Sequence, residues 1–256
     1  MNTLELLRAN VLSPLVLAFV LGIIARLMKS ELSLPKDLYT SLSIYLLLAL
    51  GLKGGVELSE TSLHAIALPA LATIALGILT PISAFLALRY LGKFGPIDSA
   101  AIAAHYGSVS AVTFIAASQF ASEVGAKPEG FMPTLLTLLE SPGIHIALAI
   151  GAFYRGRSKL YRAVHSAKSV LHEILTARSM ILLVGGLIIG FLIGAKSYEP
   201  VKPFFEGGFK GALVIFLLEM GIVAGERISD LKRVGLKLVL IGILLPVVHG
   251  TLGVLL

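Results

Sequence analysis

The sequence has no cysteine, no tryptophan and little charge. Of its 256 residues only 14% are Asp, Glu, Lys or Arg, whereas 56% are hydrophobic, and the mean hydropathy is +0.92. The absence of cysteine excludes disulfides, thiol catalysis and thiolate metal sites. A soluble domain carries roughly 25% charged residues, and a disordered chain is poor in apolar residues. The composition therefore excludes both of these classes.

Long uncharged runs fill most of the chain, for example residues 65–88 and 238–256. A helix needs about 20 mostly apolar residues to cross a bilayer. The sequence therefore predicts an all-α, polytopic helical membrane protein. Eight spans are expected at about 11–28, 38–56, 65–88, 99–122, 130–153, 179–195, 209–225 and 238–256.

The basic residues are distributed unevenly between alternate connections of these spans. One side of the membrane collects 15 of the 21 Lys and Arg residues, including those of the 154–178 connection. Cytoplasmic loops carry the Lys/Arg excess, so we expect an inner (plasma) membrane protein with both termini outside. The net charge of +6 thus reflects topology, and no nucleic-acid partner is expected.

The chain contains a predicted internal repeat. Residues 50–59 match residues 220–229, with Gly51, Gly55 and Ser59 aligned to Gly221, Gly225 and Ser229, and 77–81 matches 242–246. A five-span unit followed by its copy must insert upside down, as in secondary transporters. We expect a first repeat at 1–153, a basic cytoplasmic linker at 154–178 and a partial second repeat of three spans at 179–256, with the last two spans missing.

The fourth predicted span carries a cluster of small and polar residues at its middle: His105, Gly107, Ser108, Ser110 and Thr113. Helix propensity is weakest around residues 107–110, so we expect the helix to break there. An unwound turn offers carbonyls to a cation such as sodium, and a half-helix starting there offers N–H groups to an anion. The alternative is ordinary small-residue helix packing, and His105 can equally be a neutral histidine satisfied inside the bundle.

Three further ionisable residues within the predicted spans are candidate site residues. Glu140 is near the middle of the fifth span, where Pro142 and Gly143 weaken the helix, so carbonyls near it are expected to be exposed. An intramembrane carboxylate is a functional-site hypothesis by default, although a protonated, hydrogen-bonded Glu is the alternative. Glu219 and His249 are secondary candidates, and Glu219 can instead be a helix or subunit contact.

Sequence motifs for enzymes are missing. The chain contains no His-Glu-x-x-His, no Gly-x-Ser-x-Gly and no phosphate-binding loop. We therefore expect no catalytic residues, no cofactor and no ATP-driven step, which leaves a gradient-driven carrier.

Four segments resemble the sodium-dependent bicarbonate permease family, namely residues 106–113, 139–142, 218–228 and 246–250. The resemblance implies a ten-span inverted repeat with core and gate domains, a homotrimer, and sodium-coupled bicarbonate uptake by an elevator-like motion. It also implies that the ions bind where two broken helices cross. Some members are regulated by a cytoplasmic nucleotide-sensing trimer of the signalling-protein type, which is a possible partner here.

The resemblance assigns Gly107, Ser108, Ser110 and Thr113 to half of the ion site. Glu140 stands where the family commonly has Asp, and sodium is expected at Ser108, Ser110 and Glu140. Sodium is then the coupling ion, and bicarbonate, sodium and the lipid bilayer are the partners.

Three rival interpretations stay open. The chain can be a sodium-coupled carrier of another small organic anion, or a proton-coupled carrier that uses His105 and Glu140. It can also be a non-transporting membrane module whose basic 154–178 loop recruits a partner or anionic lipid.

Overall fold

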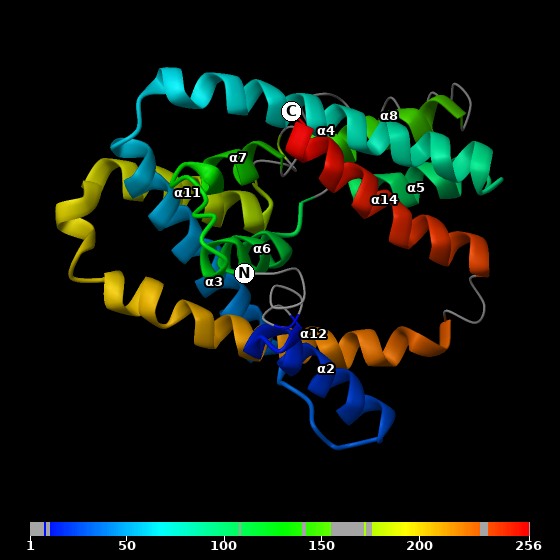
Figure 1. Cartoon of the computed structure of the whole chain (residues 1–256), viewed down its shortest axis with the longest axis horizontal. Coiled ribbons are helices and arrows are strands. Elements are labelled where there is room, and N and C mark those ends of the chain that lie inside the picture. Colours follow the sequence, from blue (N-terminus) through cyan, green and yellow to red (C-terminus); the bar gives the residue numbers. More distant parts are fainter. Residues whose placement is uncertain are drawn as a thin grey trace. The chain divides into compact units, whose positions relative to one another are not determined.

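The computed structural model describes residues 8, 11–107, 109–139, 142–154, 172, 176–230 and 235–255. These residues form helices and contain no strand, which confirms the predicted all-α class (Figure 1). The helices are α2 (Pro14–Leu27), α3 (Lys36–Ser59), α4 (Leu63–Leu86), α5 (Pro96–Tyr106), α6 (Ala111–Glu123), α7 (Met132–Leu139), α8 (Pro142–Tyr154), α11 (Arg178–Tyr198), α12 (Phe209–Arg227) and α14 (Leu236–Leu255). Short helices of other types follow three of them: the π-helical η1 (Ala87–Leu91) and η2 (Pro203–Gly207), and the 3-10 helix η3 (Ile228–Asp230).

Six helical segments of the described residues are long and apolar enough to cross a membrane. They correspond to six of the eight predicted spans. The first predicted span is a shorter apolar helix of 14 residues, α2, and the fourth is divided between α5 and α6, with 11 and 13 residues. The protein is therefore a multi-pass membrane protein. Most of the basic 154–178 connection lies outside the described residues.

Local sequence signals explain where several helices begin. Ser13 accepts a hydrogen bond from the N–H of Val16, and Pro14 occupies the first helical position of α2. Ser62 caps α4 in the same way, and Pro96 opens α5. Serine caps provide an acceptor for an otherwise unpaired N–H, and proline at the first position has no N–H to satisfy.

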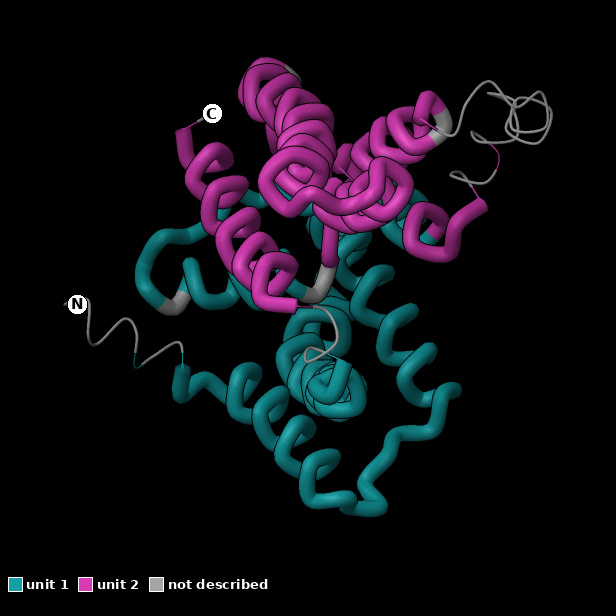
Figure 2. The backbone as a smooth tube through the Cα atoms, turned by 90° about the vertical axis from the view of Figure 1, so that its right-hand side faces the viewer, with its two compact units in different colours: residues 1–60, 111–133, 182–233 teal, residues 61–110, 134–181, 234–256 magenta. Residues whose placement is uncertain are grey.

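The chain forms two compact units (Figure 2). Unit 1 comprises residues 1–60, 111–133 and 182–233, and unit 2 comprises residues 61–110, 134–181 and 234–256. Each unit therefore contains segments from before and after the 154–178 connection. The predicted repeat concerns similarity of sequence, whereas these units are defined by packing.

Unit 1 is built on two helix crossings that pass through glycines. A methyl group on Gly51 of α3 would lie 3.1 Å from the Cα of Gly186 in α11. A methyl group on Gly221 of α12 would lie 3.1 Å from the Cα of Gly22 in α2. Because membrane helices gain little from hydrophobic exclusion, such close backbone contact is a main source of their association.

Unit 2 packs α4, α5, α8 and α14 around small side chains. Its buried core contains Ala84, Phe85, Ala100, Ala103, Ala147 and Leu245. Alanines at these positions allow α5 and α8 to approach closely, and Gly151 of α8 faces Ala100 of α5. Along α14 only Leu245 is buried, and most of its other residues form an exposed apolar surface of the kind that lipid covers.

Candidate functional site

The fourth predicted span is interrupted where its polar residues lie. Helix α5 ends at Tyr106, and the N–H of Gly107 still donates to the carbonyl of Ala103 over 3.0 Å. Gly107, Val109 and Ser110 are not helical, and α6 begins at Ala111. The structure thus confirms the predicted break.

The break touches the fifth predicted span at a glycine. A methyl group built on Gly107 would lie 2.6 Å from the Cα of Gly143 and 2.9 Å from its carbonyl oxygen. Carbon atoms normally approach to about 3.5–4.0 Å, so only glycine fits at these positions. Both residues belong to unit 2. The backbone of the break therefore lies directly against the start of α8.

This contact brings together groups suited to a cation. The last carbonyls of a helix have no partner within it and carry partial negative charge. In unit 2 the C-terminal end of α5 provides such carbonyls at Gly107, beside the Pro142–Gly143 pair. Leu139 of α7 and Pro142 both pack against Gly77 of α4, which holds this part of the fifth span against the third.

The remaining predicted site residues are distributed as follows. Ser108 and Glu140 lie outside the described residues, so the prediction of a sodium site at Ser108, Ser110 and Glu140 stays a prediction. Gly107 and Ser110 belong to unit 2, whereas Thr113 belongs to unit 1. His105 is exposed on α5. Among the described residues, no three His, Asp or Glu side chains gather closely enough to hold a metal ion.

His249 has partners that the sequence alone does not identify. Its Nε2 lies 2.8 Å from the Oγ of Ser83 in α4, so the pair joins α14 to α4 within unit 2. The ring of Tyr106 packs edge-on against the imidazole, with centroids 5.9 Å apart and planes at 83°. Ser83, like nearby Thr80, is a polar residue inside a largely apolar predicted span. Polar residues in such spans are often functional, so this pattern could have identified Ser83 from the sequence.

Glu219 has a structural contact within unit 1. Its Oε2 accepts a hydrogen bond from the backbone N–H of Leu34 over 3.3 Å. Leu34 lies in the connection between α2 and α3, and nearby Tyr39 stacks on Phe216 of α12 with ring centroids 4.9 Å apart. These contacts support the interpretation of Glu219 as a helix contact.

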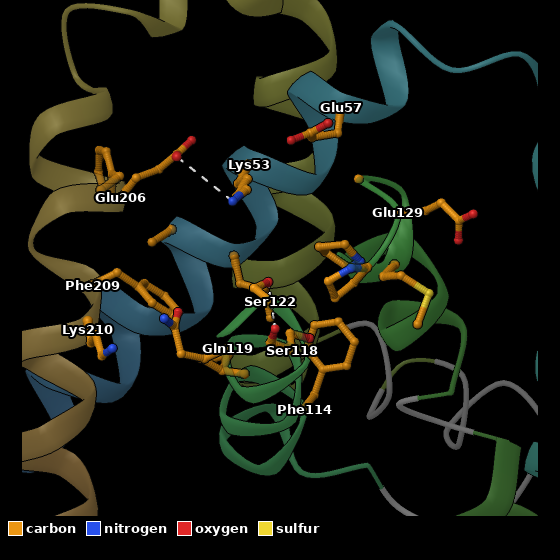
Figure 3. Close-up of a pocket in the computed structure, with 18 residues that line it drawn as sticks. Lys53, Glu57, Phe114, Ser118, Gln119, Ser122, Glu129, Glu206, Phe209 and Lys210 are labelled. Atoms are coloured by element: carbon orange, nitrogen blue, oxygen red, sulfur yellow. Dashed lines mark hydrogen bonds and ion pairs between the residues drawn. The ribbon is translucent and has the colours of Figure 1, made fainter. Parts of the chain in front are cut away.

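A cavity of about 440 Å³ lies within unit 1, between α3, α6 and the start of α12 (Figure 3). Its walls carry both signs of charge, and the Nζ of Lys53 lies 3.9 Å from the Oε2 of Glu206 across it. Ser118, Gln119 and Ser122 of α6 also line it. Of the site residues predicted from sequence, those that the structure describes do not line this cavity.

Comparison with known proteins gives one family. The model of the Na+-dependent bicarbonate transporter superfamily matches residues 14–256, which is nearly the whole chain. A comparison with curated proteins finds no match.

Proposed function

Because this chain belongs to the Na+-dependent bicarbonate transporter superfamily, we propose that it is a secondary active transporter that takes up bicarbonate together with sodium. Bicarbonate is a small monovalent oxyanion, and backbone N–H groups and hydroxyls bind such ions without a buried Lys or Arg. Sodium prefers carbonyl, hydroxyl and carboxylate oxygens. Moving both ions together cancels their charge inside the bilayer, which lowers the desolvation penalty of each.

The observation that carries the proposal is the contact between Gly107 and Gly143. It puts an interrupted helix, with its carbonyl end, against a second intramembrane segment that contains proline and glycine. Discontinuous helices that meet inside the membrane are the usual ion sites of secondary transporters. We assign sodium to Ser108, Ser110 and Glu140 together with the carbonyl end of α5 at Gly107, and bicarbonate to the backbone N–H groups at the start of α8.

The glycine crossings of unit 1 support an inverted repeat. Gly51 and Gly221, which align in the two copies, both sit at crossings: α3 crosses α11, and α12 crosses α2. The second helix of each copy therefore packs on the first helix of the other. A twofold relation between two copies produces such an exchange. We extend this proposal to an inner-membrane topology with both ends outside, and to a homotrimer that a cytoplasmic regulatory trimer can bind.

Labelled bicarbonate uptake into proteoliposomes tests the function. The full chain is expected to accumulate bicarbonate under an inward sodium gradient and not under a matched choline gradient. Excess acetate or pyruvate should compete only if the substrate is another organic anion. Uptake driven by a pH gradient without sodium would refute sodium coupling.

The assignment of Glu140 is tested by Glu140→Gln. Loss of the carboxylate should raise the sodium concentration needed for half-maximal uptake by roughly tenfold or more, since hydrogen bonds and ion contacts to charged groups contribute about 1.5–3 kcal/mol. The matched control is Glu199→Gln, because Glu199 is exposed and pairs only locally with Lys202. Unchanged sodium dependence in the Glu140 variant would remove Glu140 from the sodium site.

A further inference from the structure

The hydrogen bond between Ser83 and His249 lies beside the end of α5. It links α4 to α14, two helices separated by most of the chain, at an N···O distance of 2.8 Å. The core around it contains Leu245, Ala103 and Tyr106. All of these residues belong to unit 2, as do Gly107 and Gly143.

Ser83 makes a second contact, since its hydroxyl lies 3.0 Å from the carbonyl of Thr80 in the preceding turn. A serine hydroxyl has one proton and two lone pairs, so it can donate to Nε2 of His249 or accept from it, and the tautomer of the imidazole decides which. In either case the bond fixes the orientation of the imidazole ring, as a carbonyl or carboxylate does for many functional histidines.

The imidazole in turn holds Tyr106. The two rings meet edge to face at 5.9 Å, an arrangement favoured by the charge distribution of aromatic rings. Gly242, two turns before His249 on α14, approaches the Tyr106 hydroxyl, since a methyl group there would be 3.8 Å away. Tyr106 thus lies along α14. It is also the last residue of α5, and its carbonyl group is bonded to Gly107.

We propose that Ser83 and His249 are positioning residues for ion binding at the contact between Gly107 and Gly143. The hydrogen bond orients the imidazole, the imidazole holds Tyr106, and Tyr106 sets the position of the Gly107 carbonyl against α8. This inference rests on the proposed function, because it concerns the ion site assigned there. Neither side chain needs to contact an ion.

Transport kinetics separate this role from a purely structural one. Ser83→Ala and His249→Phe each remove the hydrogen bond, and the phenylalanine keeps a ring. Both should raise the apparent KM for sodium by about 10- to 100-fold, as do mutations of residues that orient metal ligands, with a smaller change in maximal rate. The double variant should be no worse than either single variant, because the same bond is lost. Ser83→Thr keeps the hydroxyl and should restore the KM.

The matched control is Thr251→Val on the same helix. Thr251 is exposed and its hydroxyl donates to the carbonyl of Val247 over 2.9 Å, so the variant loses one hydrogen bond that does not join two helices. It should keep the KM of the unmodified chain. Equal KM values in the Ser83→Ala, His249→Phe and unmodified chains would overturn the proposal.

A spectroscopic readout distinguishes failure of this inference from failure of the proposed function. The chain has seven tyrosines, and fluorotyrosine labelling gives one ¹⁹F signal for each, with Tyr106 assigned by Tyr106→Phe. Ser83→Ala should shift the Tyr106 signal, whereas Thr251→Val should not. A Tyr106 signal unaffected by Ser83→Ala would refute the positioning role even in an active transporter. An unmodified chain without sodium-dependent uptake, but with the expected shift, would instead refute the function and with it the ion-binding role of the contact.

Discussion

Replacing Gly107 by alanine is the most direct perturbation of the contact that carries the proposed ion site. The added methyl carbon would lie 2.6 Å from the Cα of Gly143 and 2.7 Å from its carbonyl carbon. Since carbon atoms normally stay about 3.5–4.0 Å apart, the two backbones must separate by about 1 Å. Overpacking of this kind costs about 1–3 kcal/mol of stability. A displacement of about 1 Å at a functional site can lower the rate about 100-fold.

We therefore expect Gly107→Ala to lower kcat/KM for sodium-driven bicarbonate uptake by about 100-fold, far more than its stability loss alone would produce. The control is Gly185→Ala in α11, where a methyl group would meet nothing within 4 Å, so that higher helix propensity is its main effect. Uptake into proteoliposomes and the melting temperature from circular dichroism are measured for both. A Gly107→Ala protein that transports and melts like the Gly185→Ala protein would refute the close contact.

Three further predictions concern unit 1. Glu219→Ala removes the acceptor for the Leu34 N–H and should speed limited proteolysis between α2 and α3 by roughly tenfold, since bonds to charged groups contribute about 1.5–3 kcal/mol. Glu219→Gln keeps an acceptor oxygen, so its cleavage rate should lie between those of the unmodified chain and Glu219→Ala. Equal cleavage rates in all three proteins would contradict the contact. Arg26→Ala breaks the 3.1 Å ion pair between Arg26 and Glu226. Both side chains are nearly half exposed, so the free energy of unfolding should fall by less than about 1 kcal/mol. Gly221→Leu at the adjacent crossing should prevent stable folding, and a stable Gly221→Leu protein would refute the tight packing of α2 on α12.

The helical segments of this protein follow from its sequence, because apolar length and small polar clusters are local signals. The predicted span at 209–225 is α12, and the expected break around residues 107–110 separates α5 from α6. The expectation of exposed carbonyls near Glu140 stays a prediction, since that residue lies outside the described part of the chain. The eight predicted spans correspond to six helical segments of membrane-crossing length within the described residues, because propensity does not reveal how short α2 is or how a broken span divides.

The partners of these segments could not be predicted in the same way. The contact of Gly107 with Gly143 and the bond from Ser83 to His249 depend on which helices pack together. Many residues in membrane helices are small, so a glycine in the sequence does not identify its partner. His249 could be selected as a polar intramembrane residue, whereas the role of Ser83 needs the position of α14 beside α4. The sequence thus suggests candidate site residues, but it does not reveal the packing that brings Gly107 to Gly143 or Ser83 to His249.

The glycine crossings of unit 1 also impose a delay during biosynthesis, because their two helices are synthesised at different times. Gly186 of α11, the partner of Gly51, is made 135 residues after it. At roughly 5–20 residues per second, the glycine surface of α3 waits about 7–27 s for α11 after it leaves the ribosome. During that interval lipid or the insertion machinery must occupy the surface. A bulky residue on this surface would therefore slow its release from lipid or the insertion machinery, and it would also block the later packing of α11 against α3.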